Sequence, residues 1–398
     1  MIRVGFALAF TDQSWLGGVN YFRNLFHAVW SLPNRRIEPV LLTGRKADTK
    51  LYRDFPPVEC HQTALLDWRS SLWWWRKIWQ HTLGRDVLLE RFLRRHGIKL
   101  LSHSAPMGRR ARIPSLGWIP DFQHRHLPEF FTPSECAQRE WYMMRLCREA
   151  TRMVVSSQAA QSDLANFLPE AAARSHVLRF VADPGLVETL PRREDLEARY
   201  GFHGDYFHLP NQFWAHKNHR VVIQALSVLK RQKRPVLVLA TGNNRDQRNP
   251  GFFDDLMTQT KREGIQDCFK ILGVVPYQDL MALMVHSLAV INPSLFEGWS
   301  TTIEEAKSVG KRIIVSDLPV HREQAPSGGI FFDPHSAESL AIEMFRVWEA
   351  RNPAADHQLR VEAKEQLACR MTKFALEYEA AVLATIECHE KQVKGLTH

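Results

Sequence analysis

Short apolar segments alternate with amphipathic helical segments along the chain, and this alternation restricts the possible fold more than any other feature. In the first half, Ile2–Phe10 is largely apolar, and Val19–Leu32 has apolar residues at helical spacing. Strands that are apolar on both faces and are followed by helices are typical of a parallel sheet covered on both sides. The chain is therefore predicted to be an α/β protein.

The same alternation continues to the end of the chain. Further strands are predicted at 39–42, 100–101, 115–119, 153–156, 206–209, 235–242, 269–272, 288–291 and 312–315. Further helices are predicted at 88–96, 219–230, 253–263, 279–285, 337–351 and from 353 onward. A length of 398 residues favours two domains. We expect an N-terminal Rossmann-like domain over 1–187 and a C-terminal one over 188–373, with the helix at 374–398 belonging to the first.

Two features narrow the class of protein. No run of 18 apolar residues occurs, so no transmembrane helix is predicted. The six cysteines are scattered without a C-x-x-C pair, which argues against a zinc site and a disulfide framework. A cytoplasmic location is expected from this cysteine usage.

All of the excess positive charge lies in the first half. Residues 1–187 contain 26 Lys or Arg and 16 Asp or Glu, whereas the remainder contains 26 and 27. Within Asp67–Gly97, five of the twelve tryptophans are interleaved with arginines, a combination that suits the headgroup zone of an anionic membrane. Peripheral contact with the inner face of the plasma membrane is therefore predicted. The alternatives are tryptophans packed in the core and a basic surface without a particular partner; no motif supports nucleic-acid binding.

A segment between two predicted strands carries two carboxylates eight residues apart. In Phe296–Ala306, FEGWSTTIEEA, Glu297 precedes a turn that contains Gly298, and Glu305 lies one turn inside the helix that follows. Open parallel sheets bind ligands at the carboxyl ends of their strands, and a helix N-terminus favours phosphate. We therefore expect this segment to hold a nucleotide-linked sugar. The alternative is that its acidic residues only complement the helix dipole.

Two other strand-turn-helix units have features that suit an anion. Leu209–Leu226 contains Lys217 in the turn before its helix, where an ammonium group can meet the same phosphates. Leu16–Phe22 opens the first helix with Gly17 and Gly18, which allow close approach of backbone amides. The glycine pair is not the G-x-G-x-x-G dinucleotide fingerprint, so an NAD-type protein is disfavoured.

Together these three segments resemble the family 4 retaining glycosyltransferases, which have the GT-B architecture. The resemblance rests on the E-x7-E motif from Glu297 to Glu305, the lysine turn NQFWAHKNH, and the pair Gly17-Gly18. It implies two Rossmann-like domains facing each other across a cleft, with the nucleotide sugar on the C-terminal domain and the acceptor mostly on the N-terminal one. It also implies that the C-terminal helix crosses back to the N-terminal domain, for which Phe374–Glu390 is suited. The stretch 46–99 has no counterpart that we can name.

The resemblance implies roles for individual residues. Glu305 would hold the ribose hydroxyls, Glu297 would lie beside the donor sugar, and Lys217 would neutralise the diphosphate. Further donor contacts are expected from Gly17, Gly18, Asn211, Gln212, Gly298, Trp299, Ser300 and Thr301, of which Ser300 and Thr301 are also helix N-cap candidates. The implied chemistry is retaining transfer from a nucleoside-diphosphate sugar, with no metal and no other cofactor.

The chain departs from the family pattern at two places. Gln212 stands where an arginine usually precedes the lysine by five residues, which removes one positive charge from the phosphate site. The usual His-Asp pair is replaced by Pro120-Asp121, with His124 three residues further on. Asp121 or His124 is expected to take the place of the usual histidine near the sugar. The alternative for His124 is an ordinary histidine in a surface loop.

The predicted function is a hexosyltransferase that acts on a glycan or lipid-linked acceptor in the synthesis of cell-surface polysaccharide or lipopolysaccharide. Two alternatives stay open. One is a catalytically weak or silent sugar-nucleotide-binding protein, which the two departures would suit. The other is a GT-B sugar-nucleotide epimerase, whose histidine and acidic signatures we do not find in this sequence.

Overall fold

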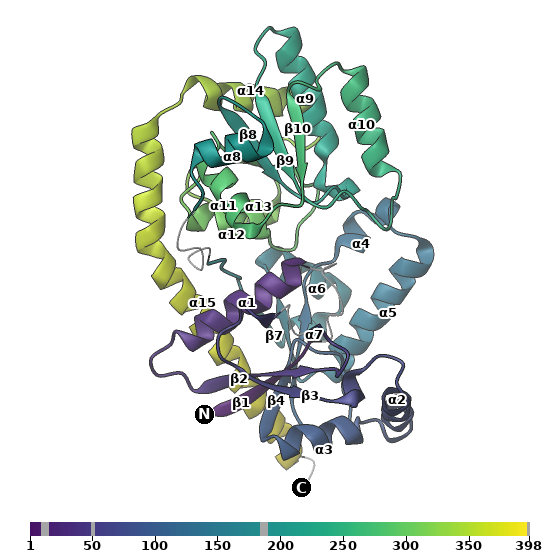
Figure 1. The fold of residues 1–398 in the computed structure, drawn as a ribbon. Coiled ribbons are helices and arrows are strands. Elements are labelled where there is room, and N and C mark those ends of the chain that lie inside the picture. Colours follow the sequence, from purple (N-terminus) through teal and green to yellow (C-terminus); the bar gives the residue numbers. More distant parts are fainter. Residues whose placement is uncertain (9–15, 49–51, 184–189, 396–398) are drawn as a thin grey trace. The chain divides into compact units, whose positions relative to one another are not determined.

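The computed structural model of the chain describes residues 1–8, 16–48, 52–183 and 190–395 (Figure 1). Its internal contacts divide the chain into two units. Unit 1 comprises Met1–Phe122, Ser134–Val181 and Cys369–His398, and unit 2 comprises Gln123–Pro133 and Ala182–Ala368. The boundary expected after residue 187 falls within 184–189, which lies outside the described residues.

Unit 1 is built on a parallel sheet of seven strands in the order β3-β2-β1-β4-β5-β6-β7. Its strands are β1 Ile2–Ala7, β2 Ile37–Thr43, β3 Glu59–Gln62, β4 Ile98–Ser102, β5 Ser115–Ile119, β6 Arg152–Val155 and β7 Ser175–Val177. Its helices include α1 Leu16–Trp30, α2 Ser71–Leu83, α3 Val87–Arg95, α5 Pro133–Glu149, α6 Gln158–Phe167 and α7 Pro169–Ala172. The core forms where apolar side chains of the strands, such as Phe6, meet the buried face of α1, including Phe22 and Phe26.

Unit 2 is built on a parallel sheet of six strands in the order β10-β9-β8-β11-β12-β13. Its strands are β8 Tyr206–Pro210, β9 Leu237–Thr241, β10 Phe269–Gly273, β11 Val290–Asn292, β12 Ile313–Ser316 and β13 Gly329–Phe332. Its helices include α4 Gln123–His126, α8 Arg193–Tyr200, α9 His219–Arg231, α10 Phe252–Arg262, α11 Tyr277–His286, α12 Thr301–Ser308, α13 Pro319–Gln324 and α14 Ala337–Glu349.

The winding direction of unit 2 reverses between β8 and β11. The chain adds β9 and β10 on one side of β8, and then adds β11, β12 and β13 in turn on the other side. The two central strands are paired in parallel, with Val290 opposite His208. At such a reversal, the loops that follow the two central strands run in opposite directions. Open α/β sheets bind their ligands between these loops.

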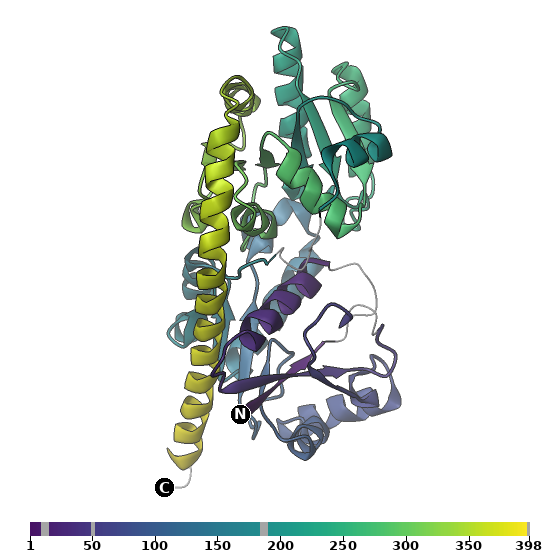
Figure 2. The same cartoon turned by 60° about the vertical axis from the view of Figure 1, so that its left-hand side comes forward.

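The last helix, α15 Pro353–Gly395, is continuous along its length (Figure 2). Its residues from Cys369 onward belong to unit 1. The hydroxyl of Tyr378 donates to Ser102 Oγ at 2.9 Å, and Glu379 pairs with Arg36 at 2.7 Å. Both Tyr378 and Glu379 are almost fully buried. The expected return of the C-terminal helix to the N-terminal domain is therefore confirmed.

The strands and helices predicted from apolar periodicity are confirmed within a few residues at each end. Elements with little apolar periodicity were not predicted. The edge strand β3 is largely exposed, and the sequence ECHQ has no buried face. Helix α2 was also missed, because its buried positions are polar and its exposed positions are apolar.

Candidate functional site

Two turns meet at the point where the winding of unit 2 reverses. Residues 211–218 lead from β8 into α9, and residues 293–300 lead from β11 into α12. The amide of Leu295 donates to the carbonyl oxygen of His216 at 2.8 Å, so the two turns are joined through their backbones. The lysine turn and the carboxylate segment predicted from the sequence therefore form one site.

Lys217 and Glu297 form the central contact of this site. The ammonium nitrogen Nζ of Lys217 lies 2.6 Å from Oε1 of Glu297, and the two side chains are only 16% and 11% exposed. Ser294 Oγ donates to the same carboxylate oxygen at 2.7 Å. Burial by itself raises the pKa of Glu297, but the Lys217 ammonium and the Ser294 hydroxyl outweigh it, and the pKa lies below its ordinary value. Glu297 is therefore a carboxylate at neutral pH.

A buried asparagine ties the site to the end of the sheet. Asn292, the last residue of β11, is fully buried. Its Nδ2 donates to Ser300 Oγ at 2.7 Å, and its Oδ1 lies 2.8 Å from Ser294 Oγ, whose one proton is shared between this oxygen and Glu297. Asn211 Nδ2 approaches the same oxygen at 3.4 Å. These bonds fix the carboxylate turn relative to the lysine turn.

The N-terminus of α12 faces the same turn. Ser300 is the N-cap, as expected, and its Oγ accepts from the amide of Ile303. The amide of Ser300 donates to Gln324 Oε1 at 3.0 Å, so this group is engaged inside the protein. The amides of Thr301 and Thr302 stand in the first turn, where a helix offers no intrahelical acceptor. The positive end of the helix dipole adds to their attraction for an anion.

The two glutamates inside α12 have different surroundings. Glu304 accepts from Gln324 Nε2 at 3.0 Å and pairs with Lys307 at 3.2 Å, so it is bound within the domain. Glu305 is also buried, and it accepts from the hydroxyl of Tyr277 at 3.2 Å. The dipole interpretation suits Glu304, which lies in the first turn. The role of Glu305 in holding ribose hydroxyls stays a prediction.

Buried histidines surround the site. Burial, together with the positive charge of Lys217, lowers the pKa of His216 to about 3, and burial lowers that of His219 to about 3. His321 is fully buried, and burial lowers its pKa as well. Its Nδ1 lies 2.8 Å from the carbonyl oxygen of Ser316 and must therefore carry the proton, which leaves Nε2 as an acceptor.

A family model matches part of this domain. The model of the family described as glycosyl transferases group 1 matches residues 206–366, which contain both turns of the site. The match is consistent with the resemblance drawn from the E-x7-E motif and the lysine turn.

Proteins of known structure share the fold over nearly the whole chain. A glycosyltransferase from Rickettsia africae superposes with a TM-score of 0.68 at 14% identity, covering 97% of this chain and 98% of its own. Anabaena HepE in complex with UDP and glucose superposes with a TM-score of 0.67 at 17% identity, covering 96% and 100%. Two Rossmann-like units with parallel sheets of seven and six strands are those of the GT-B fold.

A curated relative matches a shorter region. O-antigen chain mannosyltransferase B of Escherichia coli is 27% identical over 131 residues, which is 33% of this chain and 33% of the relative. The match thus spans about a third of that protein's length.

The remaining residues predicted from the sequence lie outside this cluster. Gly17 and Gly18 occupy the first turn of α1 in unit 1, and Gly17 is exposed, with open space where a Cβ would stand. Asp121 follows β5 in unit 1 and pairs with Arg139 at 3.0 Å. Their roles in donor binding and catalysis stay predictions.

His124 belongs to Gln123–Pro133, a short segment that interrupts unit 1 in the sequence but is part of unit 2. Within Gln123–Pro133, His124 is buried, so the alternative of a surface-loop histidine is wrong. A second histidine of the same segment contacts the carboxylate turn: the ring centroid of His126 lies 5.0 Å from that of Phe296. The sequence carried no signal for this contact, because the pairing depends on how 123–133 packs against unit 2.

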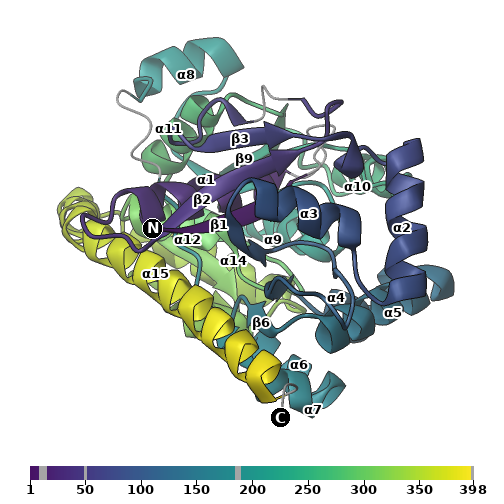
Figure 3. The same ribbon diagram turned by 90° about the horizontal axis from the view of Figure 1, so that it is seen from below.

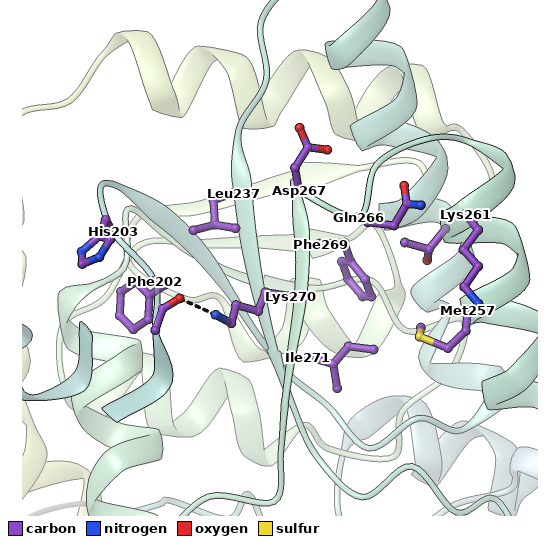
Figure 4. A pocket seen from close by; sticks show the side chains of 12 residues that line it. Phe202, His203, Leu237, Met257, Lys261, Gln266, Asp267, Phe269, Lys270 and Ile271 are labelled. Carbon is purple, nitrogen blue, oxygen red and sulfur yellow. Dashed lines mark hydrogen bonds between the residues drawn. The ribbon is translucent and has the colours of Figure 1, made fainter. Parts of the chain in front are cut away.

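Unit 2 has a pocket away from this site. A pocket of about 720 Å³ is lined by residues that include Leu237 and Phe269, the first residues of β9 and β10. In Figure 4 the side chain of Lys270 reaches across it, where it donates to the carbonyl of Gly201. The pocket thus opens at the amino ends of the strands, opposite to the ends that carry Lys217 and Glu297.

Among residues 1–8, 16–48, 52–183 and 190–395, no group of three or more His, Cys, Asp or Glu side chains is placed to hold a metal ion. In the same part of the chain, no helix is both long and apolar enough to cross a membrane.

Proposed function

We propose that this protein is a retaining glycosyltransferase that moves a hexose from a nucleoside-diphosphate sugar to a glycan or lipid-linked acceptor. The observation that carries the proposal is the 2.6 Å contact between Lys217 and Glu297 where the sheet of unit 2 reverses. This contact brings an ammonium group to the N-terminus of α12, so that one pyrophosphate can meet both.

In this proposal the bond between the anomeric carbon and the phosphate oxygen breaks, and the acceptor oxygen bonds to that carbon on the same face. The acceptor's proton leaves with the diphosphate. Charge develops on the leaving diphosphate and on an oxocarbenium-like carbon, so the groups that matter are those aimed at these charges. Lys217 and the first-turn amides of α12 would stabilise the diphosphate, and Glu297 would lie beside the donor sugar.

Glu305 would recognise the ribose. It lies one turn into α12, and Tyr277 directs its carboxylate through a hydrogen bond to one oxygen. The donor class is supported by the relative solved with UDP and glucose. Lys217 and the helix supply the positive charge that a bound metal would otherwise provide, so we propose catalysis without a metal ion.

We place the acceptor in cell-surface polysaccharide or lipopolysaccharide synthesis on the cytoplasmic side of the membrane. The matched relative is an O-antigen chain mannosyltransferase, which supports this class of acceptor. The six cysteines are scattered in the sequence without a C-x-x-C pair, which suits a reducing compartment.

The decisive experiment is a panel of nucleoside diphosphates and their sugars. We expect one diphosphate to raise the melting temperature, and its sugar to be hydrolysed slowly without acceptor, with the rate unchanged by a chelator. NMR of the transferred sugar should show the anomeric configuration of the donor. Inversion would refute the retaining mechanism, and a rate abolished by the chelator would refute metal independence.

A second candidate is a binding protein without catalytic activity, and Gln212 is the observation that favours it. Its position in the lysine turn lacks the positive charge that the family usually has there. Tight binding of a nucleotide sugar without any turnover, with any acceptor extract, would favour this candidate. If so, Gln212→Arg should create measurable hydrolysis. An epimerase would instead convert the free sugar nucleotide into its epimer, which NMR of the donor detects.

A further inference from the structure

Helix α2 of unit 1 has its polar and apolar faces reversed. Two of its residues, Arg76 and Gln80, are buried against the protein. Its exposed large apolar residues are Leu72, Trp74, Trp75, Ile78, Trp79 and Leu83. In an ordinary surface helix the apolar stripe faces the core. The alternative that the tryptophans of this region fill the core is therefore wrong for Trp74, Trp75 and Trp79, which are 44–57% exposed.

Specific polar contacts hold the helix in this orientation. The guanidinium of Arg76 pairs with Asp86 at 2.6 Å and also donates to the carbonyl oxygen of Leu65 at 2.8 Å. Gln80 donates to the carbonyl oxygen of Pro106 at 2.7 Å, and Ser70 caps the helix by accepting from Trp73 N. Removing Arg76 from Asp86 would leave a buried charge without its partner. The outward direction of the tryptophans is thus built into the unit.

The surroundings of α2 are strongly basic. Residues 63–112 contain eleven Lys or Arg but three Asp or Glu, an excess of eight positive charges. The three acids, Asp67, Asp86 and Glu90, are buried, so the exposed charges of this region are all positive. They include Arg69 at the start of α2, whose guanidinium lies 4.2 Å from the Trp68 ring centroid.

Cations also flank the other end and the side of the helix. The amide of Arg110 donates to the carbonyl of Gly84, the C-cap of α2, at 3.0 Å. Arg145 of α5 interacts electrostatically with Lys77 of α2 and lies 5.6 Å from the ring centroid of Trp141, which is itself exposed. Figure 3 shows α2, α3 and α5 of unit 1 from below.

We propose that the outward face of α2, together with these flanking cations, docks unit 1 on an anionic lipid surface. Tryptophan has an apolar ring system and a polar N–H, and it prefers the headgroup level of a bilayer over either the hydrocarbon or water. Basic side chains around it are attracted to anionic headgroups. A single projecting helix with this composition inserts its apolar face at the boundary between headgroups and acyl chains.

The charge argues against a second copy of this chain as the occupant. A two-fold interface places the same patch of both subunits face to face. Two such patches, each surrounded by the excess positive charge of residues 63–112, would then repel each other, whereas an anionic membrane neutralises that charge. The inference does not depend on the proposed catalytic activity, because vesicle binding is measured without any donor or acceptor.

The test is cosedimentation of the full chain with two kinds of vesicle. One kind is pure phosphatidylcholine, and the other also contains the anionic lipid phosphatidylglycerol, whose surface charge attracts basic segments. We expect at least about tenfold stronger partition into the anionic vesicles, weakening as salt is added. Equal partition into both kinds of vesicle would overturn the proposal.

Two variants test whether the outward face of α2 binds a lipid surface or a second copy of this chain. The triple variant Trp74→Ser, Trp75→Ser, Trp79→Ser should lose the binding, whereas Val274→Ser with Ile342→Ser removes exposed apolar residues of unit 2 and should bind normally. Near-ultraviolet circular dichroism and the melting temperature verify that both variants fold. Undiminished vesicle binding by the triple variant would overturn the proposal. So would a concentration-dependent dimer, seen by sedimentation, that the triple variant abolishes.

Discussion

Lys217 and Glu297 lie 80 positions apart in the sequence, yet their side chains share a hydrogen bond of 2.6 Å. Each follows a different central strand of the sheet in unit 2, and the backbone bond from Leu295 to His216 fixes the distance between their turns. An ammonium group held by a carboxylate is already desolvated and oriented. It can therefore stabilise a developing diphosphate without a large reorganisation.

Replacing Lys217 by alanine should lower turnover more than donor binding, because the positive charge is needed most when the leaving diphosphate forms. We expect a loss in kcat of about 100- to 1000-fold, with less than about tenfold weaker nucleotide binding. Steady-state kinetics and calorimetry measure the two quantities. Lys230→Ala is the matched control, since Lys230 forms an exposed pair with Asp267 at the same distance of 2.6 Å. Equal losses in turnover and binding would contradict the assignment.

Replacing Glu305 by alanine should weaken nucleotide binding by about 10- to 100-fold, the value of hydrogen bonds to a charged group. The control is Glu304→Gln, which removes charge from the same helix but disturbs the bonds to Gln324 and Lys307. This variant should lower the melting temperature and leave nucleotide affinity nearly unchanged. The opposite pattern would mean that Glu304 is the ligand and Glu305 the structural residue.

Ser300→Ala should destabilise the protein by about 2 kcal/mol, more than the loss of an ordinary N-cap. The substitution removes the acceptor of both the Ile303 amide and the buried Asn292 amide group. Ser336→Ala removes a cap of the same kind from α14, where Ser336 accepts from Ser339 N. It should cost about 1 kcal/mol. Urea unfolding measures the loss of stability in each of the two variants. Equal losses would show that the bond between Ser300 and Asn292 contributes nothing.

Gly242→Ala should disturb the lysine turn through a steric clash. A Cβ at Gly242, whose φ is +145°, would lie 2.4 Å from the carbonyl oxygen of Asn211, so the lysine turn must shift. We expect a loss of stability of about 2 kcal/mol or more, together with reduced turnover. Gly264→Ala is the control, because its φ is +65° but nothing lies within 4 Å of the added atom. That variant should lose about 1 kcal/mol and keep its turnover.

The protein should lose stability as the pH falls from about 6.5 toward 3. Burial lowers the pKa of His208, His216 and His219 to about 3 each, against about 6.5 in the unfolded chain. In this range the unfolded state binds more protons, so each histidine adds a slope of about 1.4 kcal/mol per pH unit. Above about pH 6.5 the three histidines are neutral in both states, so the loss of stability that they cause at low pH is absent. His208→Gln, which keeps a polar group near Thr241, should flatten the dependence by about one such slope. Chemical denaturation at several pH values measures the pH dependence of the free energy of unfolding. An unchanged slope would show that His208 is not buried in its neutral form.

The sequence by itself determined the α/β class, most of the strands and helices, and the identity of the turns that carry Lys217 and Glu297. It could do so because apolar periodicity and turn residues act over a few positions along the chain. The N-cap at Ser300 and the helix beginning at Thr301 are local in the same sense. The family resemblance added the expectation that the two turns meet.

Only the tertiary structure decided which side chains complete the site and which faces remain exposed. Tyr277, Gln324 and His321 come from helices that follow other strands, and only the order of strands in the sheet brings them to α12. The apolar residues of α2 point outward because Arg76 and Gln80 find partners inside unit 1. Composition could count those tryptophans but could not decide their direction, since a helix is oriented by partners distant in the sequence.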